Sequence, residues 1–206
     1  MPIFVGSPSK VKVQFFISEL ALNMAMLTAF ENRGLLRGHR VSSTYVKTFI
    51  PNFEEVFGKH SDVFLLIEAL SSPKVQISHD TSRFTAEASL RLLNPFNEEF
   101  EALYMVLKID ANIQFELLQD FTLIANIEDS KLEVTEFETY FQSKVTVSQM
   151  NKKLDSLKEP AIKMTNSFLG MGKGLPIPKQ IEAELSKTRL FTYDHFLMVE
   201  SDPSIE

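Results

Sequence analysis

The chain has 206 residues with no Cys, no Trp and 18 Phe, and its 21 basic and 27 acidic residues give a formal net charge of −6. The absence of Cys excludes disulfides, thiolate catalysis and Cys-based metal sites, and the acidic balance argues against a nucleic-acid partner. With seven Gly, nine Pro and 44% apolar residues, collagen-like and low-complexity classes are excluded, so we expect a large apolar interior or cavity.

The first residues, MPIFVGSPSKVKVQFF, lack the basic segment and the long apolar run of a secretory signal. We therefore expect either a cytosolic protein or a signal on sequence outside this chain. No apolar stretch reaches the roughly 18 uncharged residues that a membrane-spanning helix needs, because Glu19 and Glu31 bracket the best candidate.

The first strong element is a helix predicted over residues 18–32. Ser18 is suited to be its N-cap, and Gly34 stands just past its end, where helices commonly stop. Apolar residues cover most of its circumference, so we expect the helix to be enclosed on several sides. A shorter helix is predicted over residues 51–58, because Pro51 suits a first helical turn.

In the middle of the chain the apolar period changes to two, which is typical of half-buried strands. Residues 83–93 and 109–117 alternate in this way. The run 99–117 is too long for one flat strand, and the apolar parity shifts between Val134 and Phe137. Both features predict bends or bulges that curve the sheet.

Turns are predicted by the Asn-Pro pair at 94–95 and by the polar residues 128–130, so the strands on either side of each are expected to pair antiparallel. Near the end of the chain, residues 170–178 predict a loop by their Gly and Pro content. Strand alternation resumes at Ile181, and residues 196–199 predict a closing apolar strand.

A second helix is predicted by an apolar stripe that runs from Met150 to Phe168 at helical spacing. Pro160 stands inside this stripe and is expected to kink the helix or to divide it, because its ring and missing N–H disrupt the preceding turn. No linker or internal repeat is recognisable. The element order therefore predicts one α+β domain.

The polar residues form no catalytic or metal-binding pattern. The four His, at positions 39, 60, 79 and 195, are scattered and are expected in turns or on the surface. The Gly-x-Gly-x-Gly at 170–174 lacks the preceding strand, the following helix and the Lys-Ser/Thr pair of a phosphate loop. We therefore expect no enzyme and no cofactor. Two groups of carboxylates are assigned to solvent-facing strand positions: Glu98, Glu99 and Glu101, and Glu133, Glu136 and Glu138.

The apolar residues leave two interpretations open. A plain filled core accounts for eight Met and 18 Phe in two helices and a curved sheet. The other interpretation is a cavity for apolar ligands, because soft Met side chains adapt to variable shapes.

Five local strings follow one another along the chain: VQFFISE at 13–19, GLL at 34–36, FIP at 49–51, GLPIP at 174–178 and HFLMV at 195–199. Their order and spacing resemble the C-terminal barrel of the bactericidal/permeability-increasing and lipopolysaccharide-binding proteins, members of the tubular lipid-binding (TULIP) superfamily. The resemblance covers residues 11–202 as a single barrel. Residues 1–10 would be an N-terminal extension, and residues 203–206 a tail.

This resemblance implies a long curved antiparallel sheet wrapped around a long helix, with a second, Pro-kinked helix. It also implies an apolar tunnel for acyl chains, and hence non-enzymatic carriage or sensing of phospholipid or another long-chain lipid. Candidate lining residues lie on the two helices. They are Leu20, Met24, Leu27, Leu157, Met164 and Phe168.

Full-length relatives carry two such barrels, so the resemblance implies a second TULIP barrel as a partner, together with transient contact with a membrane surface. It places the protein outside the cell or in the secretory lumen. Relatives that capture lipopolysaccharide have basic tips, and a pI near 5.3 argues against that activity here. The alternative is a structural or interaction module with a filled core, serving as the partner half of a larger two-barrel protein.

Overall fold

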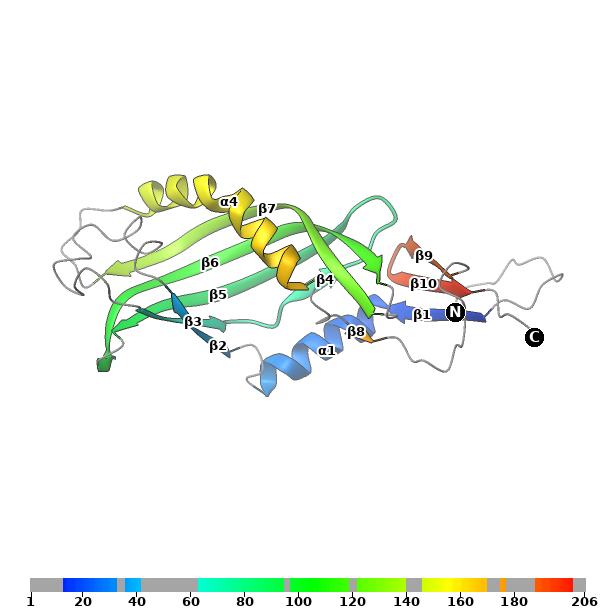
Figure 1. The fold of residues 1–206 in the computed structure, drawn as a ribbon, viewed down its shortest axis with the longest axis horizontal. Helices are drawn as coiled ribbons and strands as arrows, with labels where there is room; N and C mark the ends of the chain where they lie inside the picture. The colour runs from blue at the N-terminus through cyan, green and yellow to red at the C-terminus, as the bar shows by residue number, and fades with distance from the viewer. Residues whose placement is uncertain are drawn as a thin grey trace.

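The computed structural model describes residues 13–32, 36–41, 63–94, 97–118, 122–139, 146–169, 175–176 and 188–201 (Figure 1). These residues form two antiparallel sheets and two helices. In chain order the elements are β1 (Val13–Ser18), α1 (Glu19–Glu31), β2 (Leu36–Val41), β3 (Val63–Ala69), β4 (Lys74–Gln76), β5 (Ser82–Asn94), β6 (Asn97–Leu117), β7 (Thr122–Thr139), α4 (Val147–Leu169), β8 (Leu175–Pro176), β9 (Thr188–Tyr193) and β10 (Phe196–Ser201).

The larger sheet has seven strands in the order β2-β3-β5-β6-β7-β8, and β4 pairs with β5 beyond the end of β3. The long strands β5, β6 and β7 run side by side along the molecule and carry its curvature, and α4 lies over β7 (Figure 1). The predicted antiparallel hairpin at 94–95 is confirmed, since Asn94 pairs with Asn97. The shift of apolar parity after Val134 is also confirmed as a register shift, with Leu107 opposite Val134 and Val106 opposite Glu136.

The turn predicted at residues 128–130 is wrong, because β7 continues through this segment. Asn112 pairs with Asp129, but the next residue of β6 pairs with Ile127, so Glu128 is the extra residue of a β-bulge. A bulge places consecutive polar residues inside a strand, which makes its composition similar to that of a turn.

The smaller sheet has the order β1-β10-β9, and the predicted closing strand is its central member. The two-residue turn between β9 and β10 joins this sheet to the larger one. His195 in the turn has a φ of 71°, and its N–H donates to the carbonyl of Ile77 at 3.0 Å. The backbone N–H of Glu19 donates in return to the carbonyl of His195 at 2.8 Å. A left-handed residue in a tight turn thus links Ile77, the residue after β4, to the start of α1.

Helix α1 begins as predicted. Ser18 has extended backbone angles, and its hydroxyl accepts a hydrogen bond from the N–H of Ala21 at 3.1 Å, which is the geometry of an N-cap. The expectation that this helix is enclosed on several sides is wrong, because none of its residues is buried. Among the described elements its main contacts are with β4 and β1.

Helix α4 is continuous through Pro160 from Val147 to Leu169, so the chain is not divided there, and the kink stays a prediction. Leu175 and Pro176, within the predicted loop, form the short strand β8 that pairs with the start of β7. The predicted helix at 51–58 and the strand resuming at Ile181 lie outside the described residues. Among the helices described here, neither is long and apolar enough to cross a membrane.

Candidate functional site

One face of the seven-stranded sheet is apolar because alternate residues of β5, β6 and β7 point to the same side. We call this the inner face. Its cross-strand pairs include Ala86 with Ile109 and Ile109 with Leu132, and the next row pairs Leu107 with Val134. The residues between them, such as Asp110, point to the opposite, outer face.

Two buried clusters of apolar side chains lie at the two ends of the inner face. The first, which we call the α4 cluster, combines Met150 and Leu154 of the helix with strand residues. The second, the junction cluster, combines residues of both sheets, with Leu22 and Met26 of α1 packed against it. The strand members of the α4 cluster are Val63, Leu92, Ala102, Leu103, Met105 and Val134. The members of the junction cluster are Ile17, Val75, Ile77, Ala111, Ile113, Leu123, Leu197 and Val199.

Between the clusters lies the row Ala86, Ile109 and Leu132, which we call the central row. None of these three residues is buried, although each has a strand neighbour on one or both sides. Leu107 in the next row is also only half-buried, and it packs together with Leu132 against the α4 cluster. The middle of the inner face is therefore an apolar surface that protein covers incompletely, flanked by closed cores. Such a surface favours contact with hydrocarbon over contact with water.

Of the six candidate lining residues named from the sequence, the three on α1 belong neither to the central row nor to the two clusters as the structure describes them. Leu20 and Met24 are 71% and 53% exposed, and Leu27 is half-buried. The α1 residues that meet the apolar cluster are instead Leu22 and Met26. The other three candidates, Leu157, Met164 and Phe168, belong to α4, and their side chains lie outside those that the structure describes.

The central row was missed as a site by sequence reasoning, although part of its signal was present. The alternation in 83–93 and 109–117 places Ala86 and Ile109 on the apolar face. Leu132 was obscured because the bulge beside it was interpreted as a turn. Half-burial was not predictable, since it depends on where the helices stop along the sheet.

Two asparagine side chains fasten the helices to strand edges that pair with no further strand among the described residues. Asn23 of α1 accepts from the N–H of Val75 and donates to its carbonyl, both at 2.8 Å. Asn151 of α4 makes the same pair of bonds with Val134, at 2.7 and 3.3 Å. A carboxamide has one donor and one acceptor side, so it replaces a missing strand at each edge.

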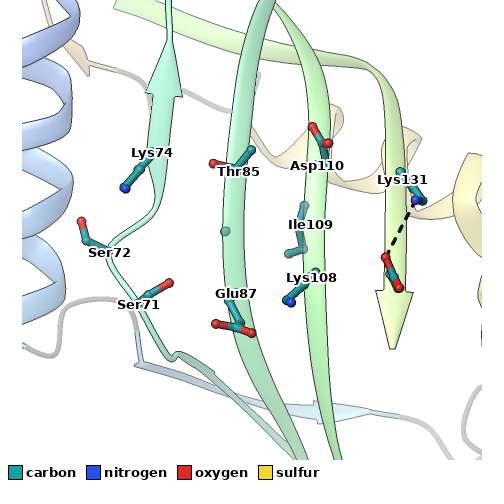
Figure 2. A pocket seen from close by; sticks show the side chains of 11 residues that line it. Ser71, Ser72, Lys74, Thr85, Glu87, Lys108, Ile109, Asp110 and Lys131 are labelled. Atoms are coloured by element: carbon teal, nitrogen blue, oxygen red, sulfur yellow. Dashed lines mark ion pairs between the residues drawn. The ribbon is translucent and has the colours of Figure 1, made fainter. Parts of the chain in front are cut away.

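The outer face behind the central row holds a polar hollow of about 400 Å³ (Figure 2). Lys74, Thr85, Asp110 and Lys131 lie in a row across four strands, with Glu87 and Lys108 beside them (Figure 2). Arg83 forms an ion pair with Asp110, and its hydrogen bond holds the pKa of that carboxyl below its ordinary value. Ala86 and Ile109 of the central row also contribute to the lining, but the alternating charges around them are suited to a hydrated surface.

The other polar predictions concern surface positions. His79 and His195 are exposed as expected, and so are Glu101, Glu133, Glu136 and Glu138, whereas His60 and the side chains of His39, Glu98 and Glu99 lie outside the described ones. In the described part of the chain, no three His, Asp or Glu side chains are grouped to hold a metal ion.

Comparison with known proteins identifies the family. The model of the LBP / BPI / CETP family, C-terminal domain, matches residues 3–204. A crystal structure of lipopolysaccharide binding protein is 14% identical, with a TM-score of 0.43, over 98% of this chain and 44% of that one. The chain thus spans less than half the length of that protein, and no curated protein matches it. Because the family model matches nearly the whole chain, the chain belongs to the LBP/BPI/CETP family of lipid-binding proteins and corresponds to its C-terminal domain.

Proposed function

We propose that the inner face binds the hydrocarbon chain of a lipid, and that the protein is a non-enzymatic carrier or sensor of phospholipid or another long-chain lipid. The observation that carries this proposal is the central row, an apolar surface that is only partly buried between two closed clusters. Membership of a lipid-binding family supports it independently.

The energetics favour hydrocarbon as the ligand. Each CH₂ group removed from water contributes about 0.8 kcal/mol, so a chain lying along Ala86, Ile109 and Leu132 needs no charged partner. A net charge of −6 is therefore no obstacle to acyl-chain binding, although it disfavours capture of an anionic headgroup. The half-buried Leu107 in the next row widens the contact.

The finer features implied by the resemblance belong to the same proposal. They are an apolar tunnel for acyl chains and a sheet wrapped around a long helix within residues 11–202, and a kink at Pro160. A second barrel as a partner, transient contact with membrane surfaces and a lumenal or extracellular location complete the proposal. On the helical side, the proposed lining residues are Leu20, Met24, Leu27, Leu157, Met164 and Phe168.

Lipid extraction and mass spectrometry of the purified protein, followed by uptake of a fluorescent phospholipid, test the proposal. Ile109→Trp fills the central row and is expected to weaken uptake about tenfold, which corresponds to 1.4 kcal/mol. Lys108→Trp is the matched control, because the adjacent residue of β6 points to the outer face. Equal uptake by the two variants would contradict the site. Absence of both bound and acquired lipid would favour the structural or interaction module with a filled core.

A further inference from the structure

Helix α1 is attached to β4 by polar side chains on one of its faces. Asn23 bonds to both backbone groups of Val75 at 2.8 Å. One turn earlier, the Oε2 of Glu19 accepts from the N–H of Ile77, also at 2.8 Å. Positions four apart share a helix face, and alternate residues of a strand present their N–H groups to the same edge. The helix therefore follows the chain edge from Val75 in β4 to Ile77 just after it.

The apolar contacts of α1 are weak by comparison. No residue of the helix is buried, and Leu22 and Met26 are only partly buried against the junction cluster. Leu20 and Met24 are 71% and 53% exposed. Segments with few buried apolar contacts open locally at a small free-energy cost, well below that of global unfolding.

Helix α4 makes a similar polar connection to the sheet but, unlike α1, also buries apolar side chains. Its Asn151 bonds to Val134 just as Asn23 bonds to Val75. Beside this bond, however, Met150 is fully buried and Leu154 is 9% exposed, and both belong to the α4 cluster. The same polar connection is thus combined with a packed core in α4 but not in α1.

We propose that α1 is a strap that detaches from β4 as a unit, and that its opening admits the hydrocarbon chain of a lipid to the inner face. The second half of this inference rests on the proposed function. When the strap opens, the bonds of Asn23 and Glu19 break together, and the amides of Val75 and Ile77 become accessible at the same moment. The junction cluster next to the central row then loses its cover from Leu22 and Met26.

Amide hydrogen exchange tests the strap without any lipid. In the unmodified protein, the amides of Val75 and Ile77 are expected to exchange at matching rates, faster than that of Ile113 in the centre of the sheet. Asn23→Ala should accelerate both amides about tenfold, the factor that 1.4 kcal/mol produces. The Ile77 amide is the decisive probe, because Glu19 and not Asn23 bonds to it, so only opening of the whole helix can accelerate its exchange. Asn23→Asp, which keeps the shape and loses the donor, should act in the same direction.

Asn151→Ala is the matched control, and it should accelerate the Val134 amide while leaving those of Val75 and Ile77 unchanged. Acceleration of Val75 alone in the Asn23 variants would overturn the opening of α1 as a unit. The opening of α1 would also be overturned if both amides exchanged only at the rate of global unfolding.

Uptake of a fluorescent phospholipid from phosphatidylcholine vesicles then tests the entry step. Asn23→Ala is expected to take up lipid faster than the unmodified protein. Asn151→Ala is expected to take up lipid at the same rate as the unmodified protein. An unchanged uptake rate in Asn23→Ala would overturn α1 as the entry. If no protein acquired lipid, the proposed function and the entry step would both fail, while the exchange result would still decide whether α1 opens.

Discussion

Asn151 and Val134 are joined by two hydrogen bonds through which one side-chain amide satisfies both backbone groups of a strand residue. Among the described residues, no strand pairs with β7 on this side of Val134, which is only 2% exposed. Asn151→Ala leaves these groups without a partner, and we expect it to lower the free energy of unfolding by about 1–3 kcal/mol. Urea denaturation measures the change. Lys152→Ala, at an exposed position of the same helix, should leave the midpoint nearly unchanged.

Two methionines allow the same substitution to be compared in different surroundings. Met150 is fully buried in the α4 cluster, whereas Met24 is 53% exposed on α1. Met150→Ala should cost about 2–5 kcal/mol, because it removes buried atoms and leaves a cavity. Met24→Ala should stay within about 0.5 kcal/mol, as surface substitutions usually do. Equal losses in thermal or urea denaturation would show that Met24 is covered in solution.

Gly38 of β2 lies close against the aromatic ring of a residue on the neighbouring strand. A Cβ atom at this position would overlap the ring of Phe64 on β3, which is the strand paired with β2. We expect Gly38→Ala to destabilise the protein by about 1–3 kcal/mol through overpacking. Phe64→Leu in the same chain should recover part of this loss, so a double-mutant cycle gives a coupling energy. Strictly additive effects would exclude the contact.

Acid conditions should weaken the attachment of α4 to β7. The hydrogen bond from Lys158 holds the pKa of Asp129 below its ordinary value of 3.8, and a backbone bond from Ser130 adds to this. A lowered folded-state pKa stabilises the fold at pH values above the ordinary pKa, and this stabilisation disappears as the pH falls through the lowered pKa. NMR titration of the Asp129 carboxyl measures its pKa in the folded protein. Lys158→Met should move the titration upwards, and an unchanged midpoint would exclude the ion pair.

Much of the secondary structure was predictable because its signals are local. The N-cap at Ser18, the alternation that places Ala86 and Ile109 on one face, and the register shift after Val134 all follow from neighbouring residues. Each depends on helix or strand geometry over a few positions, which the side-chain period reports directly.

The errors arose where one composition fits two structures. Residues 128–130 have the polarity of a turn and form a bulge, because pairing with β6 holds them in the strand. The apolar residues of α1 suit an enclosed helix, yet none is buried. In both places the composition is compatible with either outcome, and contacts with distant residues select one.

The sequence by itself determined the two described helices, the apolar face of the sheet and the family to which the chain belongs. Only the tertiary structure decided that β1 pairs with β10, that Asn23 and Asn151 close the strand edges, and that Ile109 is only partly buried between two clusters. The period of a strand shows which face it buries, but it carries no information about what covers that face. Coverage depends on where segments far apart in the chain come to lie, and here it stops short of the central row.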